Sequence, residues 1–519
     1  MIHKDFYSYH LYRVLFSHLI FWTMQIKRSI LVIVGCLALV SSIFLGCKKD
    51  TTAAAPKPII PVVIKDTSIV NRFIYTSLRD YYLWNAQVPS LNNTKYNNKD
   101  SLNAYLNSYA DPQKFFASLL YQQNTVDKWS FLVNDPNTIS NWIQGISETM
   151  GYDFMLSYIG TSTNVFGFVR YVFKGSPAEK AGIKRGDLFM KVNDTQLTAT
   201  NYQSLLFNNI TYKLSFASLA NNVISLNGKS VTMTAVTMQE NPILVDTVLN
   251  VGNLKVGYLM YNAFNAGFDI QLNNVFKKFK DAPINKLVLD LRYNGGGSVQ
   301  SAKYLASMIY GTKTTSPFLK SQYNSGLQAY LTSVNGAASL IENFIANIDS
   351  TTTTPVAAIN ALNLTDVYFI TSDNTASASE LLINGLKPYM TVFSVGSNTA
   401  GKYVASWTLQ DWDANGNVNP KDKYAMQPIV VKIANANGIS DFINGLSPDY
   451  AATEDIANLL PLGDRNETLL KPILNKIQGF PLAAISTKAA AMGLKKLTDS
   501  QAQKVFSQQM YMARPNLKK

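Results

Sequence analysis

The sequence predicts a multidomain α/β protein, because consecutive stretches of the chain follow different patterns. Residues 66–147 are rich in aromatic side chains and carry apolar residues at three- and four-residue spacing, which predicts a small helical domain. Residues 148–242 change to short strand-like runs with glycine-containing turns, which predicts a β-rich domain. Residues 243–480 alternate strand and helix patterns, so we expect a mostly parallel sheet with helical crossovers. For residues 481–519 we expect a basic helical tail.

The composition is that of a chain that can bury several cores. Its 519 residues are 47% hydrophobic, which excludes a disordered protein. Lys and Arg outnumber Asp and Glu by 46 to 33, but this excess is spread along the chain. The densest basic cluster, KKFK at residues 277–280, lies in a helical pattern and is expected to be a solvated face. Because no basic tract is interleaved with aromatic residues, we expect no nucleic-acid partner.

The positions of histidine and cysteine narrow the chemistry. All three histidines and both cysteines lie within the first 47 residues, and the rest of the chain contains neither type. For the body of the chain this excludes a Ser-His-Asp triad, a cysteine nucleophile, a histidine-ligated metal site and an intrachain disulfide. A catalytic base must therefore be Lys, Asp, Glu or Tyr, and we expect neither a metal nor a cofactor.

The N-terminus has the pattern of an export signal. Within residues 1–47, Lys27 and Arg28 precede an apolar run that ends at Gly46-Cys47, which is typical of a secretory signal peptide. A small residue directly before a cysteine resembles a bacterial lipoprotein cleavage site, at which Cys47 would be acylated. The alternatives are an uncleaved membrane anchor and a plain signal peptide with a chance cysteine. Residues 1–23 are left open as a misassigned start, and residues 48–65 read as a Pro/Ala/Thr linker.

A segment of the β-rich domain, GSPAEKAGIKRGD at residues 175–187, resembles the signature of bacterial PDZ domains. Its proline starts a short helix, and its glycines end that helix and turn the chain into a strand. PDZ domains bind a peptide carboxyl terminus by adding it as a strand beside a helix. The matching carboxylate-binding loop would comprise Gly151, Tyr152 and Phe154, although the charge of the intervening Asp153 would repel a carboxylate. A PDZ fold that serves only as a spacer is the alternative.

Three loops of the α/β domain carry residues suited to chemistry, and each follows a predicted strand. The first is DLRYNGGGS at residues 290–298, which leaves a buried strand and enters a helix. It lacks the lysine of a phosphate-binding P-loop and the third glycine of a dinucleotide fingerprint. Backbone N–H groups at a helix start bind anions, including an oxyanion, so we interpret the three glycines as functional rather than as a structural turn.

The second loop is TSDNTASASE at residues 371–380. Ser377 and Glu380 have the spacing of a helix capping box, and capping alone is one interpretation of this loop. A serine at a helix start is also well placed as a nucleophile, because the helix dipole and free N–H groups stabilise negative charge that develops beside it.

The third loop, GSNTAGKYVA at residues 396–405, places Lys402 among small and apolar residues. An ordinary surface lysine is the alternative. In a desolvated pocket the charged form of the lysine is disfavoured and its pKa falls, so that a neutral amine can take a proton from serine. In a chain body without histidine, this is the route to an activated serine that the composition favours.

Together these segments resemble the carboxyl-terminal processing peptidases, also called tail-specific proteases, a family of serine peptidases. The resemblance covers about residues 66–460. It rests on the PDZ-like segment, the loop at 290–297, the TASASE run at 375–380, the Gly401-Lys402 step and the NGLSPD turn at 444–449. It implies a catalytic domain related to the ClpP/crotonase fold, accompanied by a PDZ domain.

The resemblance also implies roles for individual residues. Ser377 would be the nucleophile and Lys402 the general base. The backbone N–H groups of Gly296 and Ala378 would bind the oxyanion. Glu380 matches an acidic position of the family motif and would orient the site.

Two departures from the family pattern leave parts of the site open. Many members have glutamine four residues after the lysine, where this chain has Ser406. A third catalytic member is therefore unassigned, with Ser406 and Gln410 as candidates. Gly295 stands where many members have proline, which should loosen the loop without removing donors. Ser379 is the competing nucleophile.

The resemblance and these residues predict a serine endopeptidase that cleaves proteins or peptides with a Ser-Lys dyad. We expect it in the bacterial cell envelope, lipid-anchored to a membrane and on the periplasmic or cell-surface face. Its partners would be polypeptides that are unfolded or have accessible carboxyl termini, and homo-oligomerisation is left open. The alternative is a non-catalytic lipoprotein that holds peptides or apolar ligands in the PDZ groove or the crotonase-like cleft.

Overall fold

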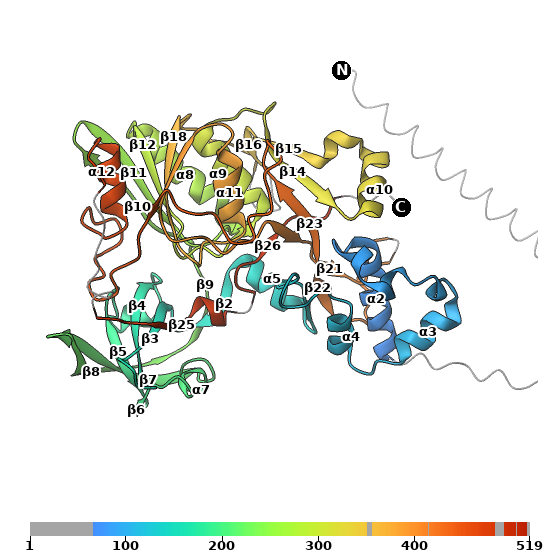
Figure 1. Ribbon diagram of the computed structural model, residues 1–519, viewed down its shortest axis with the longest axis horizontal. Helices are drawn as coiled ribbons and strands as arrows, with labels where there is room; N and C mark the ends of the chain where they lie inside the picture. Colours follow the sequence, from blue (N-terminus) through green and yellow to red (C-terminus); the bar gives the residue numbers. More distant parts are fainter. Residues whose placement is uncertain (1–65, 350–354, 414, 483–491, 505, 516–519) are drawn as a thin grey trace, which may run out of the picture. The chain divides into compact units, whose positions relative to one another are not determined.

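A computed structural model describes residues 66–349, 355–413, 415–482, 492–504 and 506–515, and it confirms the predicted multidomain α/β architecture (Figure 1). The predicted signal peptide, Cys47 and the linker lie outside these residues. Within the described part of the chain, no helix is long and apolar enough to cross a membrane.

The N-terminal region is helical, as its apolar spacing predicts. Its helices are α2 (Asp66–Tyr81), α3 (Lys99–Asn107), α4 (Pro112–Ser118) and α5 (Pro136–Gln144). The 3-10 turns Asn85–Gln87, Pro89–Asn92 and Thr94–Asn97 connect α2 to α3. Asp111 and Asp135 cap α4 and α5 by accepting backbone N–H groups, and proline follows each cap at a position that needs no N–H donor. Buried side chains of this region, such as Phe73 and Phe115, belong to the same core as the α/β domain.

The β-rich region folds around an antiparallel sheet of order β25-β3-β4-β5-β7-β8, with β6 paired to β5. Its elements are β3 (Tyr152–Tyr158), β4 (Val165–Val172), α6 (Pro177–Lys180), β5 (Leu188–Val192), β6 (Thr195–Gln196), α7 (Tyr202–Leu206), β7 (Thr211–Ala220) and β8 (Val223–Thr234). Helix α6 begins at Pro177, as the glycine-punctuated segment predicts, and Ser176 Oγ caps it by accepting the Glu179 N–H at 3.1 Å. Phe154, Val169 and Phe189 lie in its own core.

The α/β region is built on a sheet of order β10-β11-β12-β18-β19-β24, which is parallel from β11 onward. The strands are β10 (Ile243–Val251), β11 (Leu254–Tyr261), β12 (Lys286–Asp290), β18 (Asp366–Thr371), β19 (Thr391–Gly396) and β24 (Tyr450–Ala451). The helices α8 (Asp269–Asp281), α9 (Val299–Tyr310) and α11 (Ala378–Leu386) share one core with Leu287 and Leu289, whereas α12 (Leu470–Ile477) packs with Val288. Because strand side chains alternate, these helices cover opposite faces of the sheet.

A second sheet packs against the same core, in the order β13-β26-β20-β23-β14-β15. Its strands are β13 (Gly297–Ser298), β26 (Met510–Tyr511), β20 (Val404–Ser406), β23 (Ile429–Ala434), β14 (Pro317–Tyr323) and β15 (Ile341–Asn343). A small sheet of β1 (Phe131–Val133), β22 (Ala425–Gln427) and β21 (Leu409–Gln410) joins the helical region to the α/β region. The other described elements are the helix α10 (Ser325–Asn335), the short strands β2 (Ile146–Thr149), β9 (Val236–Gln239), β16 (Asn347–Ile348) and β17 (Ala357–Ala358), and the 3-10 turns Ala266–Phe268 and Ala337–Leu340.

The predicted helical tail is wrong for the C-terminal residues that the structure describes. These residues form β25 (Lys496–Asp499), the 3-10 turn Gln501–Gln503 and β26. Strand β25 adds to the edge of β3, and β26 lies in parallel between β13 and β20. Pairing with strand edges that are distant in sequence overrides the local helical preference, and no periodicity within the segment could have indicated it.

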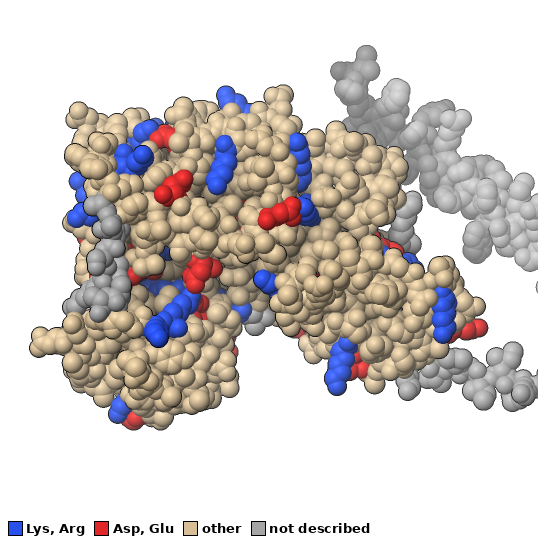
Figure 2. All heavy atoms as spheres, viewed as in Figure 1, with Lys and Arg blue, Asp and Glu red and all other residues tan. Residues whose placement is uncertain are grey.

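Charged side chains are scattered over the face in Figure 2, with acidic groups among the basic ones. The KKFK cluster lies on α8, where Lys277, Lys278 and Lys280 are exposed while Phe279 is buried in the core. The prediction of a solvated basic face is therefore confirmed for this helix.

Candidate active site

Ser377 lies in a strained turn between β18 and α11. Its φ of 67° and ψ of −117° cost a non-glycine residue roughly 1–3 kcal/mol. The turn is held against the loop after β12, because Thr375 Oγ1 donates to the Leu291 carbonyl at 2.8 Å and the Ala376 N–H donates to the Asn294 carbonyl at 3.1 Å. The Ser377 side chain is buried, and its Oγ has no hydrogen-bond partner among the described residues. The turn thus holds a hydroxyl that no described neighbour satisfies.

Ser379, the competing nucleophile, is committed to a structural contact. Its side chain is buried, and its Oγ donates to the Asn294 carbonyl at 3.1 Å. Of the two serines, Ser377 is therefore the one whose hydroxyl is available for reaction.

Glu380 links the serine loop to the lysine loop. Its Oε2 accepts the N–H of Ser377 at 2.7 Å and the N–H of Lys402 at 2.8 Å. Its Oε1 accepts the Gly401 N–H at 2.7 Å and the hydroxyl of Thr399. Burial raises the pKa of this carboxyl, while the hydrogen bonds oppose the rise. Because the Glu380 carboxylate also accepts the N–H groups of Gly401 and Lys402, capping alone does not describe Glu380, which brings two loops together.

Lys402 is fully buried, which rules out the alternative of a surface lysine. Its Nζ lies 5.2 Å from the centre of the Trp129 ring and donates to Gln509 Oε1 at 2.8 Å. Burial lowers the pKa of the amine well below its usual value, and the charges of Asp127 and Glu380 only partly oppose this. The amine is therefore biased toward the neutral form that a general base requires. Within the described structure, no hydrogen bond joins it to Ser377 Oγ.

Gln509 is the residue of this site that sequence reasoning missed. Among the described residues, neither candidate for the third member hydrogen-bonds the amine. Ser406 Oγ is hydrogen-bonded to the Gln427 side chain and donates to the Met510 carbonyl at 3.1 Å, and Gln410 is on β21 opposite Ala425. Gln509 instead comes from the C-terminal segment, far beyond the lysine in sequence. A contact across such a separation leaves no motif spacing, so no signal within this single sequence could have indicated it.

The glycine-rich loop after β12 packs directly on the serine. Gly296 has a φ of 105°, and a Cβ there would lie 2.5 Å from Ser377 Cβ, so that only glycine fits. The Gly296 N–H donates to Asn294 Oδ1 at 2.9 Å and is therefore occupied in this structure. For the Ala378 N–H, at the first residue of α11, no hydrogen bond is found among the described residues. The roles of both groups as oxyanion donors stay predictions, and that of Gly296 requires the Asn294 side chain to release it.

A cavity of about 750 Å³ adjoins this loop. Its walls include Gly295 and Gly296 from the loop, Trp142 from the helical region, and Tyr152 and Phe154 from the PDZ-like region. Neither Ser377 nor Lys402 lines it, because the glycine loop lies between the cavity and the serine. Among the described residues, no cluster of three or more His, Cys, Asp or Glu side chains is arranged to hold a metal ion.

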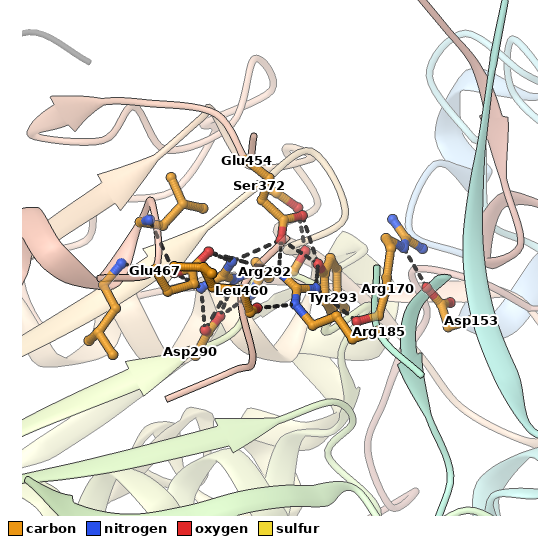
Figure 3. Close-up of polar contacts among 12 residues, drawn as sticks. Asp153, Arg170, Arg185, Asp290, Arg292, Tyr293, Ser372, Glu454, Leu460 and Glu467 are labelled. Carbon is orange, nitrogen blue, oxygen red and sulfur yellow. Dashed lines mark hydrogen bonds and ion pairs between the residues drawn. The ribbon is translucent and has the colours of Figure 1, made fainter. Parts of the chain in front are cut away.

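A buried network of opposite charges surrounds Arg292, at the strand end where the glycine loop begins (Figure 3). Arg292 is paired with Asp290 at 2.7 Å, with Glu467 at 2.7 Å and with Glu454 at 2.9 Å. Arg185, from the PDZ-like region, contacts Glu454 at 2.7 Å. Although burial acts against it, the two guanidinium groups lower the pKa of Glu454 to about 2. The strand end that precedes the loop is thereby fixed to the PDZ-like region.

The predicted carboxylate-binding loop of the PDZ-like region is engaged with the chain itself. Tyr152 OH lies 2.8 Å from Tyr212 OH, and the Phe154 N–H donates to Ser500 Oγ at 3.1 Å. Gly151, with a φ of 81°, packs against Ser176. The adjoining edge of β3 is occupied by β25. Capture of a peptide carboxylate by Gly151, Tyr152 and Phe154 stays a prediction.

Comparison with known families agrees with this geometry. Residues 255–451 match the model of peptidase family S41, residues 70–131 match the peptidase S41 N-terminal domain, and residues 168–207 match a PDZ domain. The chain belongs to peptidase family S41. The S41 match contains Ser377, Lys402 and the glycine loop, so the family predicted from the motifs is confirmed.

Individual relatives of this S41 chain are distant. A "Probable CtpA-like serine protease" from Staphylococcus aureus (strain bovine RF122 / ET3-1) is 26% identical over 254 residues, covering 47% of this chain and 43% of the relative. A protein of the same name from Staphylococcus saprophyticus is 25% identical over 251 residues, with the same coverage. The chain thus spans less than half the length of these relatives. The crystal structure of a "Putative S41 protease" from Bacteroides fragilis NCTC 9343 matches with a TM-score of 0.60 and 26% identity, covering 78% of this chain and 97% of that one.

Proposed function

We propose that this protein is a serine endopeptidase of the carboxyl-terminal processing type, with Ser377 as nucleophile and Lys402 as general base. One observation carries the proposal: a strained serine with an unpartnered hydroxyl shares the carboxylate of Glu380 with the loop of a fully buried lysine. Membership of family S41 and the similarity to proteins named serine proteases support it.

In the proposed reaction, Ser377 Oγ attacks a peptide carbonyl while the neutral Lys402 amine takes the hydroxyl proton. The N–H of Ala378, and that of Gly296 once Asn294 releases it, would stabilise the tetrahedral oxyanion. Lys402 then gives its proton to the leaving amine, and an acyl-enzyme remains. Lys402 then takes a proton from a water molecule as its oxygen adds to the ester carbonyl. When the bond between the acyl carbon and Ser377 Oγ breaks, Lys402 returns that proton to Oγ, so that the carboxyl product leaves and the serine is restored.

The surroundings of the site support a substrate class. We propose polypeptides that are unfolded or have an accessible carboxyl terminus, because the cavity beside the glycine loop is bounded by both the PDZ-like region and the S41 domain. Its lining includes Trp142, Phe154 and Phe207, which suit apolar side chains of an extended chain.

The test is cleavage of a denatured, tail-tagged protein by purified wild type, Ser377→Ala and Ser379→Ala. We expect Ser377→Ala to abolish cleavage and labelling by a fluorophosphonate probe, and Ser379→Ala to retain both because its hydroxyl contacts only a backbone carbonyl. Cleavage by Ser377→Ala would disprove the assignment. A wild-type chain that binds peptides but neither cleaves nor labels would instead be the non-catalytic binding protein that is the alternative function.

We also propose that the chain is lipid-anchored in the bacterial envelope through Cys47, on the strength of the basic and apolar residues that precede it. Cells fed an alkyne fatty acid should label the wild type and not Cys47→Ser. Equal labelling of the two would exclude acylation at this residue.

A further inference from the structure

The C-terminal segment, defined here as residues 492–504 and 506–512, reaches both the PDZ-like sheet and the catalytic centre. Its strand β25 pairs with β3, and its strand β26 pairs with β13 at the end of the glycine loop. Gln509 is the residue before β26, and its carbonyl oxygen would lie 2.9 Å from a Cβ placed on Gly296. One segment thus connects two regions that the sequence analysis treated as separate domains.

The side chain of Gln509 is held in one orientation. It is only 6% exposed, and its Nε2 donates to the Trp129 carbonyl at 3.1 Å. This fixes the amide so that Oε1 faces the amine of Lys402, which donates to it at 2.8 Å. The amine therefore lies between an amide oxygen and the face of the Trp129 ring, at 5.2 Å from the ring centre.

The charged groups that face Lys402 are Asp127 and Glu380, and both are engaged by other donors. Asp127 accepts the Tyr82 hydroxyl at 2.7 Å and the backbone N–H groups of Trp129 and Ser130. Glu380 accepts the backbone N–H groups of Ser377, Gly401 and Lys402. Among the described residues, Gln509 is the side chain that hydrogen-bonds the amine. A neutral amide can hold the amine without adding a negative charge that would keep it protonated.

The strand that precedes Gln509 is anchored to the PDZ-like region. The Ser500 N–H donates to the Phe154 carbonyl at 2.9 Å, and Ser500 Oγ donates to Asp153 Oδ2 at 2.7 Å. Asp499 lies 3.5 Å from Arg170, whose other partner is Asp153 (Figure 3). This is the strand edge at which PDZ domains add a peptide. Here it carries the chain's own segment, and the Asp153 charge that would repel a peptide carboxylate binds that segment instead.

We propose that Gln509 is the positioning residue of Lys402, and that docking of β25 on strand β3 holds Gln509 in the catalytic centre. The PDZ-like region thereby completes the active site from within the chain. This inference rests on the proposed dyad of Ser377 and Lys402, and it adds Gln509 as the residue that positions the base.

The first test compares full-length Gln509→Ala with Lys495→Ala. Lys495 belongs to the same segment, its side chain is exposed, and it does not line the cavity. We expect Gln509→Ala to lower kcat by about 10- to 100-fold, because the base is no longer held in place, and Lys495→Ala to leave it unchanged. Equal activity of the two variants would overturn the proposal. A rise in activity for Gln509→Ala would also overturn it, because the segment would then be a plug.

The second test separates positioning from a structural role. In Gln509→Glu a carboxylate faces the amine and raises the pKa of Lys402, so the acid limb of kcat/KM should move up by about one pH unit or more. A side chain that only supports the fold would lower activity equally at every pH and leave the limb in place. That result would overturn the proposal.

The third test concerns the anchor, which is the contact of Ser500 with Phe154 and Asp153 of the PDZ-like region. Ser500→Ala removes the hydroxyl that joins Phe154 and Asp153, and we expect a loss of kcat smaller than that of Gln509→Ala. If the anchor acts through Gln509, the double variant should be no worse than Gln509→Ala alone. If the losses of kcat in the two single variants instead multiply in the double variant, the proposal that docking of β25 holds Gln509 in place is overturned. Inactivity of the wild type would count against the proposed function instead, so the two failures are distinguishable.

Discussion

Two buried polar clusters contact the loops of the candidate active site, and they are built in opposite ways. In the cluster around Arg292, its guanidinium faces three carboxylates within 3 Å. In the cluster around Lys402, the amine is bound by a neutral amide, and Ser377 Oγ has no partner among the described residues. The buried charge of Arg292 is thus paired with carboxylates, whereas the buried amine of Lys402 is hydrogen-bonded to a neutral group.

This difference explains why the Arg292 cluster is a rigid support and why the Lys402 cluster is reactive. Burial penalises an ion, and opposite charges at hydrogen-bond distance offset that penalty, so the Arg292 cluster can stay ionised and hold the loop. Where the offsetting charges are already engaged elsewhere, as at Lys402, the buried group sheds its proton instead and becomes a base. The same low-polarity interior therefore produces a fixed support and a reactive centre.

The largest effect should come from Lys402→Met, which replaces the amine by an apolar side chain of similar length. We expect kcat to fall by at least roughly 10³-fold, because the base is lost. The free energy of unfolding should stay the same or rise, because a desolvated amine no longer has to be buried. Peptide cleavage and urea unfolding measure the two quantities. The exposed Lys421→Met is the control, and a strongly destabilised Lys402→Met would contradict the comparison.

Arg292→Met should lower the stability of the protein rather than remove a group that takes part in catalysis. It leaves Asp290 and Glu467 buried without their counter-ion, so the free energy of unfolding should fall by about 3–5 kcal/mol. Arg79→Met, which breaks an exposed pair with Asp80, should change it by less than about 0.5 kcal/mol. Urea unfolding monitored by circular dichroism gives both values, and similar losses in the two variants would remove the distinction between the clusters.

A smaller effect should appear in acid. The pKa of Glu454 is lowered to about 2 in the folded protein, so its ion pairs contribute stability above its ordinary pKa near 4.5. That contribution, on the order of 3 kcal/mol, is lost as the pH falls toward 2. Activity depends on the neutral amine of Lys402 and should decrease as the pH falls through the pKa of that group.

The measurement is unfolding free energy against pH for wild type and Glu454→Gln. The variant should show a shallower decline between about pH 5 and pH 2. Asp499 still contributes, because, although burial acts against this, Arg170 and Lys496 lower its pKa to about 2. Glu342→Gln, at a partly buried pair with Lys303, should keep the wild-type decline. A decline of equal steepness in Glu454→Gln would assign the acid sensitivity to other groups.

Local patterns were sufficient for much of the site. The alternation of strands and helices predicts the parallel sheet, and the loops at its strand ends contain Ser377, Glu380, Lys402 and Gly296. Those residues could be found because each lies within a short motif whose spacing reflects a turn or a helix start. Ser406 and Gln410 were poorer candidates for the third member, since side chains on short β strands take their contacts from sheet pairing.

The sequence by itself determined the loops and the residue types that can react, because turns and helix starts depend on neighbours within a few residues. Tertiary structure alone decided that Lys402 would be buried beside Trp129 and that Gln509 would reach it from the C-terminal segment. It also decided that β25 would fill the edge of β3. Burial and strand pairing depend on contacts between distant residues, and such contacts leave no local pattern to read.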